Sequence, residues 1–226
     1  MTITADPYLQ ATFFIDSDHD QIVEFAETTC NNDRTPVEKA VSLYYAVRDG
    51  FRYDPFDLQY EATTLKASSV LIKGSGYCVA KAILLAALGR QQGIPCRLGF
   101  ADVTNHLSTP KLRAWMGTNL FIYHGYTEMY LRNKWVKATP AFNLSLCTRF
   151  KVKPLEFDGT MDSIFHEYDT NGDQHMEYVR EHGHFEDLPF ERIFSAYMKT
   201  YPNLFKLIAE SKVPAFEATI SQHQDH

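Results

Sequence analysis

The stretch that most constrains this chain is Gly74–Leu88, in which a small-residue loop leads through one cysteine into a strongly apolar run. We expect a buried helix over Cys78–Gln92, ended by Gly93. Cys78 then lies in the first helical turn, where unpaired backbone N–H groups and the helix dipole favour the reactive thiolate. A buried cysteine that only packs against its neighbours is the commoner case. The remaining sequence has to decide between these two interpretations.

Composition excludes several classes of protein. The chain has 226 residues and a net charge of -6, without the clustered basic residues of a nucleic-acid-binding protein. It has no stretch of about 18 apolar residues that would predict a membrane span, and its start lacks the pattern of a signal peptide. The cysteines form no CxxC pair and no zinc-site spacing. We therefore predict a cytoplasmic protein with free thiols, no cofactor, and no nucleic-acid or membrane partner. The sequence contains no pattern that indicates an oligomeric state.

Periodicity predicts an α+β fold. Helices are expected N-terminal to Cys78, over 18–30, 36–48 and 65–71, with a Thr35 and Glu38 capping box at the start of the second. Strands are expected over 96–103, 120–131, 134–139 and, at a sheet edge, 150–157. The later segments 162–168, 177–181, 190–199 and 203–211 are expected to be helical. The predicted organisation is a core over residues 1–150 and a mainly helical C-terminal extension over residues 151–226, packed on the same domain.

A base for the cysteine is expected on the first strand of the hairpin. His124, Tyr126, Glu128 and Tyr130 share one face of that strand by period two. A thiol nucleophile needs a base within hydrogen-bond reach, and a helix that begins at Cys78 would face a strand that carries His124. A histidine on a strand is more often an ordinary polar residue, so this pairing is a hypothesis.

Several segments occur in a recognisable order: Phe51-Arg52-Tyr53, Gly76-Tyr77-Cys78 with its helix, Leu88–Arg97, and His124–Leu131 followed by Trp135-Val136. Together they resemble the transglutaminase-like superfamily of cysteine acyltransferases and hydrolases, over roughly residues 40–140. The resemblance implies a papain-like or transglutaminase-like core with the cysteine helix packed on an antiparallel sheet. It also implies that Cys78 is the nucleophile and His124 the general base and acid. The substrate would be a peptide, a protein or a small amide, attacked to form a thioester.

One position departs from the family pattern. Thr139 stands where the resemblance leads us to expect an aspartate that completes the triad. A threonine oxygen can accept the histidine N–H, although it cannot stabilise an imidazolium by charge. Asn143 is the second candidate for this role, while Glu128 lies two pleats away from His124. The alternative hypothesis is a catalytically silent binding module. Tyr77 and Tyr126 are expected to shape the cleft.

The segment Asp169–Asp173 resembles the start of a calcium loop. Gln174 stands where such a loop has glycine, and Arg180 stands where it has a bidentate glutamate. A polar turn is therefore the better interpretation. The nearby histidines follow no metal-ligand spacing, so we predict no metal site.

Overall fold

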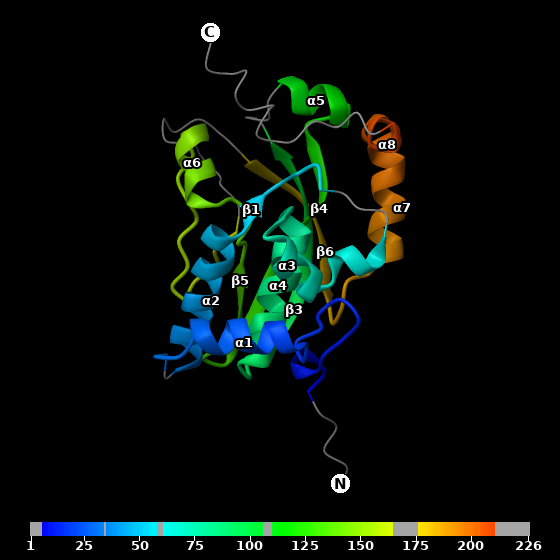
Figure 1. The fold of residues 1–226 in the computed structure, drawn as a ribbon. Coiled ribbons are helices and arrows are strands. Elements are labelled where there is room, and N and C mark those ends of the chain that lie inside the picture. The colour runs from blue at the N-terminus through cyan, green and yellow to red at the C-terminus, as the bar shows by residue number, and fades with distance from the viewer. Residues whose placement is uncertain (1–5, 34, 58–60, 106–109, 165–175, 211–226) are drawn as a thin grey trace.

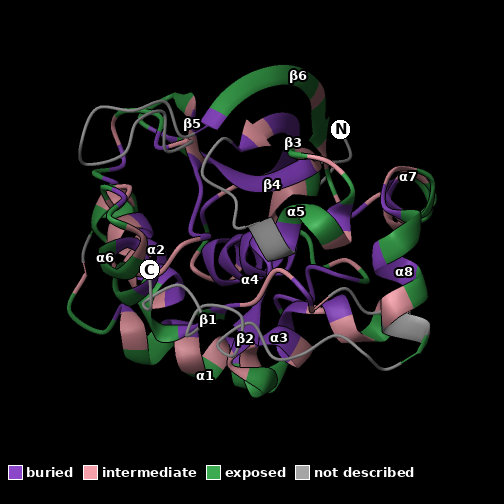
Figure 2. Cartoon of the chain, turned by 90° about the horizontal axis from the view of Figure 1, so that it is seen from above, coloured by how far each residue is buried: buried purple, intermediate pink, exposed green. Residues whose placement is uncertain are grey.

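The computed structural model describes the chain except residues 1–5, 34, 58–60, 106–109, 165–175 and 211–226. Its centre is α4 (Cys78–Gln91), in which every residue from Cys78 to Arg90 is buried. Seen from above, α4 lies between the sheet on one side and α1, α2 and α3 on the other (Figure 2). A helix that is apolar on all sides has no face for solvent, so this position in the core follows from its sequence. The predicted buried helix is confirmed.

The other helices lie outside α4 and the sheet, with α1 at the bottom and α5 at the top of the view in Figure 1. The others are α1 (Asp20–Thr29), α2 (Pro36–Gly50), α3 (Ala67–Lys73), α5 (Pro110–Met116), α6 (Leu144–Phe150), α7 (Phe190–Thr200) and α8 (Pro202–Ala209), with short 3-10 turns η1 (Pro7–Leu9) and η2 (Ala62–Leu65). The capping box is present at the start of α2: the Thr35 hydroxyl accepts from the Glu38 N–H, and the Glu38 carboxylate accepts from the Thr35 N–H. These contacts fix where α2 begins.

In the described residues, the main sheet is four-stranded and antiparallel, in the order β5-β4-β3-β6. Its strands are β3 (Cys96–Asn105), β4 (Leu120–Leu131), β5 (Lys134–Ala138) and β6 (Met176–Phe185). Two further short strands, β1 (Arg52–Tyr53) and β2 (Ser75–Gly76), pair in parallel just before α4. The hairpin between β4 and β5 turns at Arg132 and Asn133, both with positive φ. The predicted α+β class, with the cysteine helix on an antiparallel sheet, is confirmed.

Two secondary-structure predictions after residue 140 are wrong. Residues 177–181 are not helical but belong to β6, where most side chains are exposed. An edge strand of this kind lacks the alternation that identifies a strand, and pairing with β3 sets its conformation. Residues 150–157 form no strand, because α6 extends to Phe150 and is followed by Lys151 with φ of 54°. The sheet thus receives its fourth strand from the region that we predicted to be mainly helical.

Among the helices that the structure describes, none combines the length and the apolarity that a membrane crossing requires.

Candidate active site

Cys78 is the first residue of α4, as expected. Tyr77 precedes it as the N-cap and makes no side-chain capping hydrogen bond. The first N–H groups of the helix are therefore not capped by that residue. The β1 and β2 pair fixes the chain immediately before this helix, because Tyr53 lies beside Gly76 in the register.

Cys78 and His124 line the same pocket. Its empty volume is about 410 Å³ when the solvent at its mouth is included, and its lining comprises Tyr53, Pro55, Tyr77, Cys78, Met116, Phe121, Ile122, His124, Tyr197 and Tyr201. The pocket lies where the start of α4 meets β4, and α5, α7 and the Tyr201 region enclose it. Among the described residues that line it, none is aspartate, glutamate, lysine or arginine. The fold therefore joins a thiol and an imidazole in a largely aromatic environment.

A glycine allows α4 and β4 to approach so closely. A β-carbon at Gly125 would lie 2.9 Å from the Cα and 3.3 Å from the backbone nitrogen of Val79. Real side chains do not tolerate such distances to backbone atoms, so only glycine lets the strand contact the first turn of the helix. Gly125 follows His124 and Val79 follows Cys78, so this contact sets the spacing of the two candidate catalytic residues.

Burial disfavours the thiolate of Cys78, whereas we expected the N-terminal position on the helix to favour it. Desolvation raises the pKa of Cys78 to about 11, although backbone hydrogen bonding at Gly125, Val79 and Cys78 itself acts in the opposite direction. The N-terminal position on the helix is present, but burial outweighs it, because a buried thiolate loses its hydration. The resting thiol is therefore protonated at neutral pH, and a base has to take up its proton when it reacts.

The structure brings together some of the predicted site residues. Tyr77 lines the pocket with Cys78 and His124. Tyr126 does not: its hydroxyl donates to Glu181 of β6 at 3.0 Å. Its ring packs over Gly99, where no side chain stands in the way, so these contacts do not place Tyr126 in the pocket, and its role in the cleft stays a prediction.

The two candidates for orienting His124 are engaged differently. The Thr139 hydroxyl is buried and has no hydrogen-bond partner among the described residues. The Asn143 side chain accepts from the Tyr53 N–H at 3.3 Å and donates to the Ser145 hydroxyl at 2.5 Å. In this arrangement neither side chain forms a hydrogen bond with His124, so the role that we predicted for Thr139 or Asn143 is not seen in the contacts.

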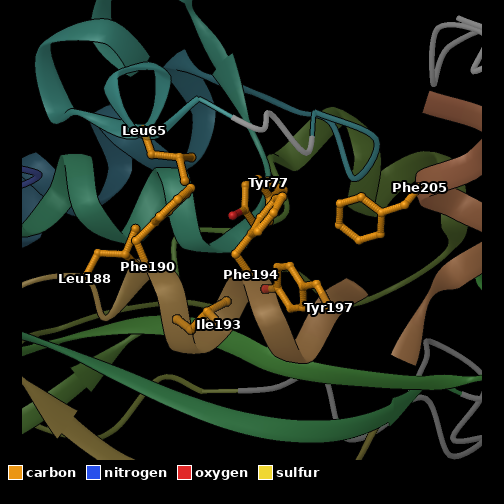
Figure 3. Close-up of a pocket in the computed structure, with 8 residues that line it drawn as sticks. All are labelled: Leu65, Tyr77, Leu188, Phe190, Ile193, Phe194, Tyr197 and Phe205. Atoms are coloured by element: carbon orange, nitrogen blue, oxygen red, sulfur yellow. The ribbon is translucent and has the colours of Figure 1, made fainter. Parts of the chain in front are cut away.

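A second pocket, with an empty volume of about 310 Å³ when the solvent at its mouth is included, adjoins the first. Figure 3 shows its lining, which is apolar apart from the two tyrosine hydroxyls: Leu65, Tyr77, Leu188, Phe190, Ile193, Phe194, Tyr197 and Phe205. Tyr77 and Tyr197 belong to both pockets. The two pockets thus share two aromatic side chains, and one of them, Tyr77, directly precedes Cys78 in the chain.

No metal centre is found in the part of the chain that the structure describes: no group of three or more histidine, cysteine or acidic side chains is placed to hold an ion. The segment Asp169–Asp173, with its resemblance to a calcium loop, lies outside the described residues. All four cysteines are buried and free.

A family model described as the transglutaminase-like superfamily matches residues 23–140, which is more than half of the 226 residues. The chain belongs to the transglutaminase-like superfamily. The match begins in α1 and ends just after β5, so it contains Cys78, His124 and Thr139. Strand β6 and helices α7 and α8 lie beyond it, although two of these elements contribute to the pockets of this transglutaminase-like chain.

The solved structures that match share little sequence with this member of the superfamily. A "putative cysteine protease" from Cytophaga hutchinsonii is 16% identical with a TM-score of 0.47, and the alignment covers 78% of this chain and 53% of that one. This chain thus spans about half the length of that protein. An arylamine N-acetyltransferase from Mycobacterium abscessus is 13% identical with a TM-score of 0.41, covering 59% and 46% of the two chains. A "putative protease" from Parabacteroides distasonis is 18% identical with a TM-score of 0.37, covering 53% and 23%. No curated protein matches the chain.

Sequence reasoning missed several residues of the pocket. Tyr197 and Tyr201 enter it from α7 and from the residue that directly follows α7, more than seventy positions after His124. The helical spacing of the apolar residues in α7 indicates a buried face but not the element against which that face packs. Only the folded chain shows that the C-terminal region closes this pocket.

Proposed function

We propose that this protein catalyses acyl transfer through a thioester at Cys78. The observation that carries the proposal is that Cys78 and His124 line one pocket, where their chain neighbours Val79 and Gly125 pack closely against each other. Membership of the transglutaminase-like superfamily supports the assignment of these two residues. A nucleophile with a nearby base is the arrangement that covalent acyl transfer needs.

The reaction begins with proton transfer from the Cys78 thiol to His124. The sulfur attacks the carbonyl carbon of an amide or ester, and the carbonyl oxygen becomes an oxyanion that the Cys78 backbone N–H can stabilise. When the tetrahedral intermediate collapses, the bond to the leaving nitrogen or oxygen breaks, and His124 returns the proton to that atom. Water or an amine, deprotonated by His124, then attacks the thioester and releases the thiol.

The lining of the pocket supports a particular class of substrate. Tyrosine, phenylalanine, methionine, isoleucine and proline side chains surround Cys78, and no charged side chain is among the described lining residues. A charged acyl group would lose its hydration here without gaining a partner. We therefore expect an uncharged, apolar or aromatic acyl group, which can extend along Tyr77 and Tyr197 toward the second pocket.

The experiment is thiol labelling with iodoacetamide, read residue by residue by mass spectrometry. Cys30, Cys96 and Cys147 are matched controls, because they are buried and burial also raises their pKa values, to about 11, 12 and 11. Cys78 should react faster than all of them, and His124→Asn should remove most of that advantage. Equal labelling of Cys78 and the three controls would contradict the proposal.

A binding module without catalysis is the second candidate. It is favoured by the Thr139 hydroxyl, which has no hydrogen-bond partner in the part of the chain that the structure describes. In that case the transglutaminase-like pocket holds an amide without cleaving it. Thr139→Asp discriminates between the two candidates when variant and wild type are assayed with a panel of acyl anilides and peptide amides. Turnover by the wild-type protein rules out the silent module. Turnover by neither protein, with both folded, supports it.

A further inference from the structure

Strand β4 contains a bulge directly before His124. The register passes from Val103 opposite Phe121 to Ala101 opposite His124, so Ile122 and Tyr123 together lie opposite the single residue Asp102. An extra residue bends a strand and changes the direction of the side chains that follow it. The direction of the His124 side chain therefore depends on how this bulge is held.

Tyr123 has a backbone conformation that its side chain disfavours. Its φ is 52°, in the left-handed region that glycine adopts readily and that a bulky residue rarely occupies. Such a conformation persists only where the surrounding structure holds it, and it is often found beside functional sites. The contacts of Tyr123 should therefore include the groups that keep it in place.

Each polar atom of Tyr123 has a partner. Its N–H donates to Asp102 Oδ1 at 2.9 Å, its hydroxyl accepts from Arg192 Nε at 3.0 Å, and its carbonyl accepts from the Tyr197 hydroxyl at 3.4 Å. Its ring is stacked on His182, with 3.9 Å between ring centroids and 13° between planes. We call the four partners, Asp102, His182, Arg192 and Tyr197, the Tyr123 clamp.

His182 is itself at a bulge, which lies on β6, the second strand that pairs with β3. The register passes from Phe100 opposite Gly183 to Ala101 opposite Glu181, which leaves His182 without a residue opposite it. Gly183, with φ of 83°, allows the turn of the backbone. The His182 Nε2 lies 2.6 Å from Asp102 Oδ1, and the two side chains are only 5% and 11% exposed. Since a carboxylate can only accept, the proton of this buried bond is on Nε2.

We propose that Asp102, His182 and Arg192 are positioning residues that hold Tyr123 in its left-handed conformation and thereby direct His124 toward Cys78. Asp102 joins the two bulges, because its carboxylate accepts from both Tyr123 and His182. His182 and Arg192 lie beyond residues 23–140, in the part of the chain outside the superfamily match. The proposal rests on the proposed function and adds to it, since it gives β6 and α7 a role in setting the base.

The test compares His182→Ala with wild type and with His124→Asn. The rate of Cys78 alkylation by iodoacetamide is measured from pH 5 to 9 in each protein and in the double variant. We expect His182→Ala to lower the rate at neutral pH by roughly tenfold to a hundredfold, because small displacements of a reacting group have effects of this size. The double variant should be no slower than His124→Asn alone. His184→Ala is the matched control, being a histidine with an exposed side chain two residues later on the same strand.

A second readout follows His124 directly. In protein labelled with ¹⁵N and ¹³C, the imidazole resonances of His124 should shift in His182→Ala and stay in place in His184→Ala. Cys78 alkylation that is independent of His124 would overturn the proposed function. In that case the imidazole resonances still decide whether His182 positions the ring.

Other outcomes would overturn the clamp itself. One is that His182→Ala shows the same dependence of Cys78 alkylation on pH as the wild type and that its His124 resonances do not shift. Another is a rate that falls equally whether or not His124 is present, since that would indicate a general structural effect. If His182→Ala does not fold, Asp102→Asn and Arg192→Met decide by the same two readouts. Arg192 is exposed on α7, so its replacement removes the bond to the Tyr123 hydroxyl without opening the core. Unchanged alkylation and resonances in both variants would refute the proposal.

Discussion

At the scale of single residues, burial decides the state of the nucleophile. The pKa of the Cys78 thiol is raised to about 11 because a thiolate would be desolvated there. A protonated thiol reacts slowly, so its reactivity at neutral pH depends on transfer of the proton to His124. The pH dependence of alkylation therefore separates the intrinsic behaviour of the thiol from the contribution of the base.

We predict that the rate of Cys78 alkylation in His124→Asn rises about tenfold per pH unit between pH 7 and pH 10, because the thiolate fraction does so below a pKa of about 11. The wild-type protein should react faster near neutral pH and show a shallower rise. Stopped-flow alkylation across this pH range measures both profiles. Superimposable profiles would show that His124 does not take up the proton.

A second residue, Lys81, stabilises the position of α4. It is fully buried, and its ammonium donates to the carbonyl oxygens of Arg48, Phe51 and Ala141 at 2.9, 2.7 and 2.9 Å. These acceptors belong to the end of α2, the segment after it and the segment after β5. The three donors of one side chain thus join three separate parts of the chain around the cysteine helix.

Lys81→Met should lower the free energy of unfolding by about 2–4 kcal/mol, because three buried carbonyl oxygens lose their donor. Urea denaturation measures the loss. Lys73→Met is the matched control, since Lys73 is 43% exposed and pairs with the Asp57 carboxylate and not with three buried carbonyl oxygens. That variant should change the free energy of unfolding by less than about 1 kcal/mol. A similar loss in both variants would contradict the role of the three carbonyl oxygens.

Burial also lowers the pKa of Lys81 to about 7 from an ordinary value of 10.5. Between these values the folded protein binds fewer protons than the unfolded chain, so the free energy of unfolding increases as pH rises. We expect Lys81 to contribute an increase of about 1–2 kcal/mol from pH 7 to pH 8.5. Burial raises the pKa values of the four thiols, so they lower the free energy of unfolding over the same pH range in any variant that keeps them. Urea denaturation at several pH values should therefore show the Lys81 contribution as the difference between the wild type and Lys81→Met.

At the scale of elements, the contact between α4 and β4 brings the thiol to the imidazole. It depends on the missing side chain of Gly125, beside which the backbone of Val79 packs. Backbone atoms cannot rotate away as a side chain can, so any added group must displace the whole helix or the strand. The distance between Cys78 and His124 changes with that displacement.

Gly125→Ala should therefore lower the free energy of unfolding by about 1–3 kcal/mol and slow Cys78 alkylation by more than about tenfold. Gly50→Ala is the control, because a β-carbon at Gly50 would meet nothing within 4 Å. That variant should keep the wild-type alkylation rate and change the free energy of unfolding by less than about 1 kcal/mol. Wild-type alkylation in a folded Gly125→Ala protein would show that the close approach is not required.

At the scale of the whole molecule, residues beyond the superfamily match are part of the same core. Arg90 is buried and donates to carbonyl oxygens of Gln10, Cys96 and Glu186, which joins the N-terminal segment, the start of β3 and the chain after β6. Strand β6 covers the second edge of β3, and Tyr197 of α7 reaches the candidate active site. The C-terminal region therefore completes both the sheet and the pocket.

A protein limited to residues 1–150 should not melt cooperatively, because it exposes the edge of β3 and leaves the Arg90 guanidinium without one of its carbonyl partners. Circular dichroism during heating, with the full chain measured alongside, tests this expectation. A cooperative transition with the same antiparallel sheet signal would show that residues 1–150 fold independently.

Much of the fold could be predicted from local signals. The apolar run after Cys78, the capping box at Thr35 and the turn at Arg132 and Asn133 each have a short-range physical cause, and each is present in the structure. Strand β6 could not be predicted in this way, because its mostly exposed residues lack the alternation that identifies a strand. Its conformation comes from hydrogen bonding to β3, which is distant in the sequence.

By itself, the sequence determined that a buried helix begins at Cys78 and that a hairpin carrying His124 follows, since apolar periodicity and turn residues act over a few positions. It also identified the superfamily. Only the tertiary structure decided which residues surround the thiol, that burial raises its pKa, and that Asp102 and His182 meet at paired bulges beside His124. These properties depend on desolvation and on contacts between residues far apart in the chain, and neither exists before the chain is folded.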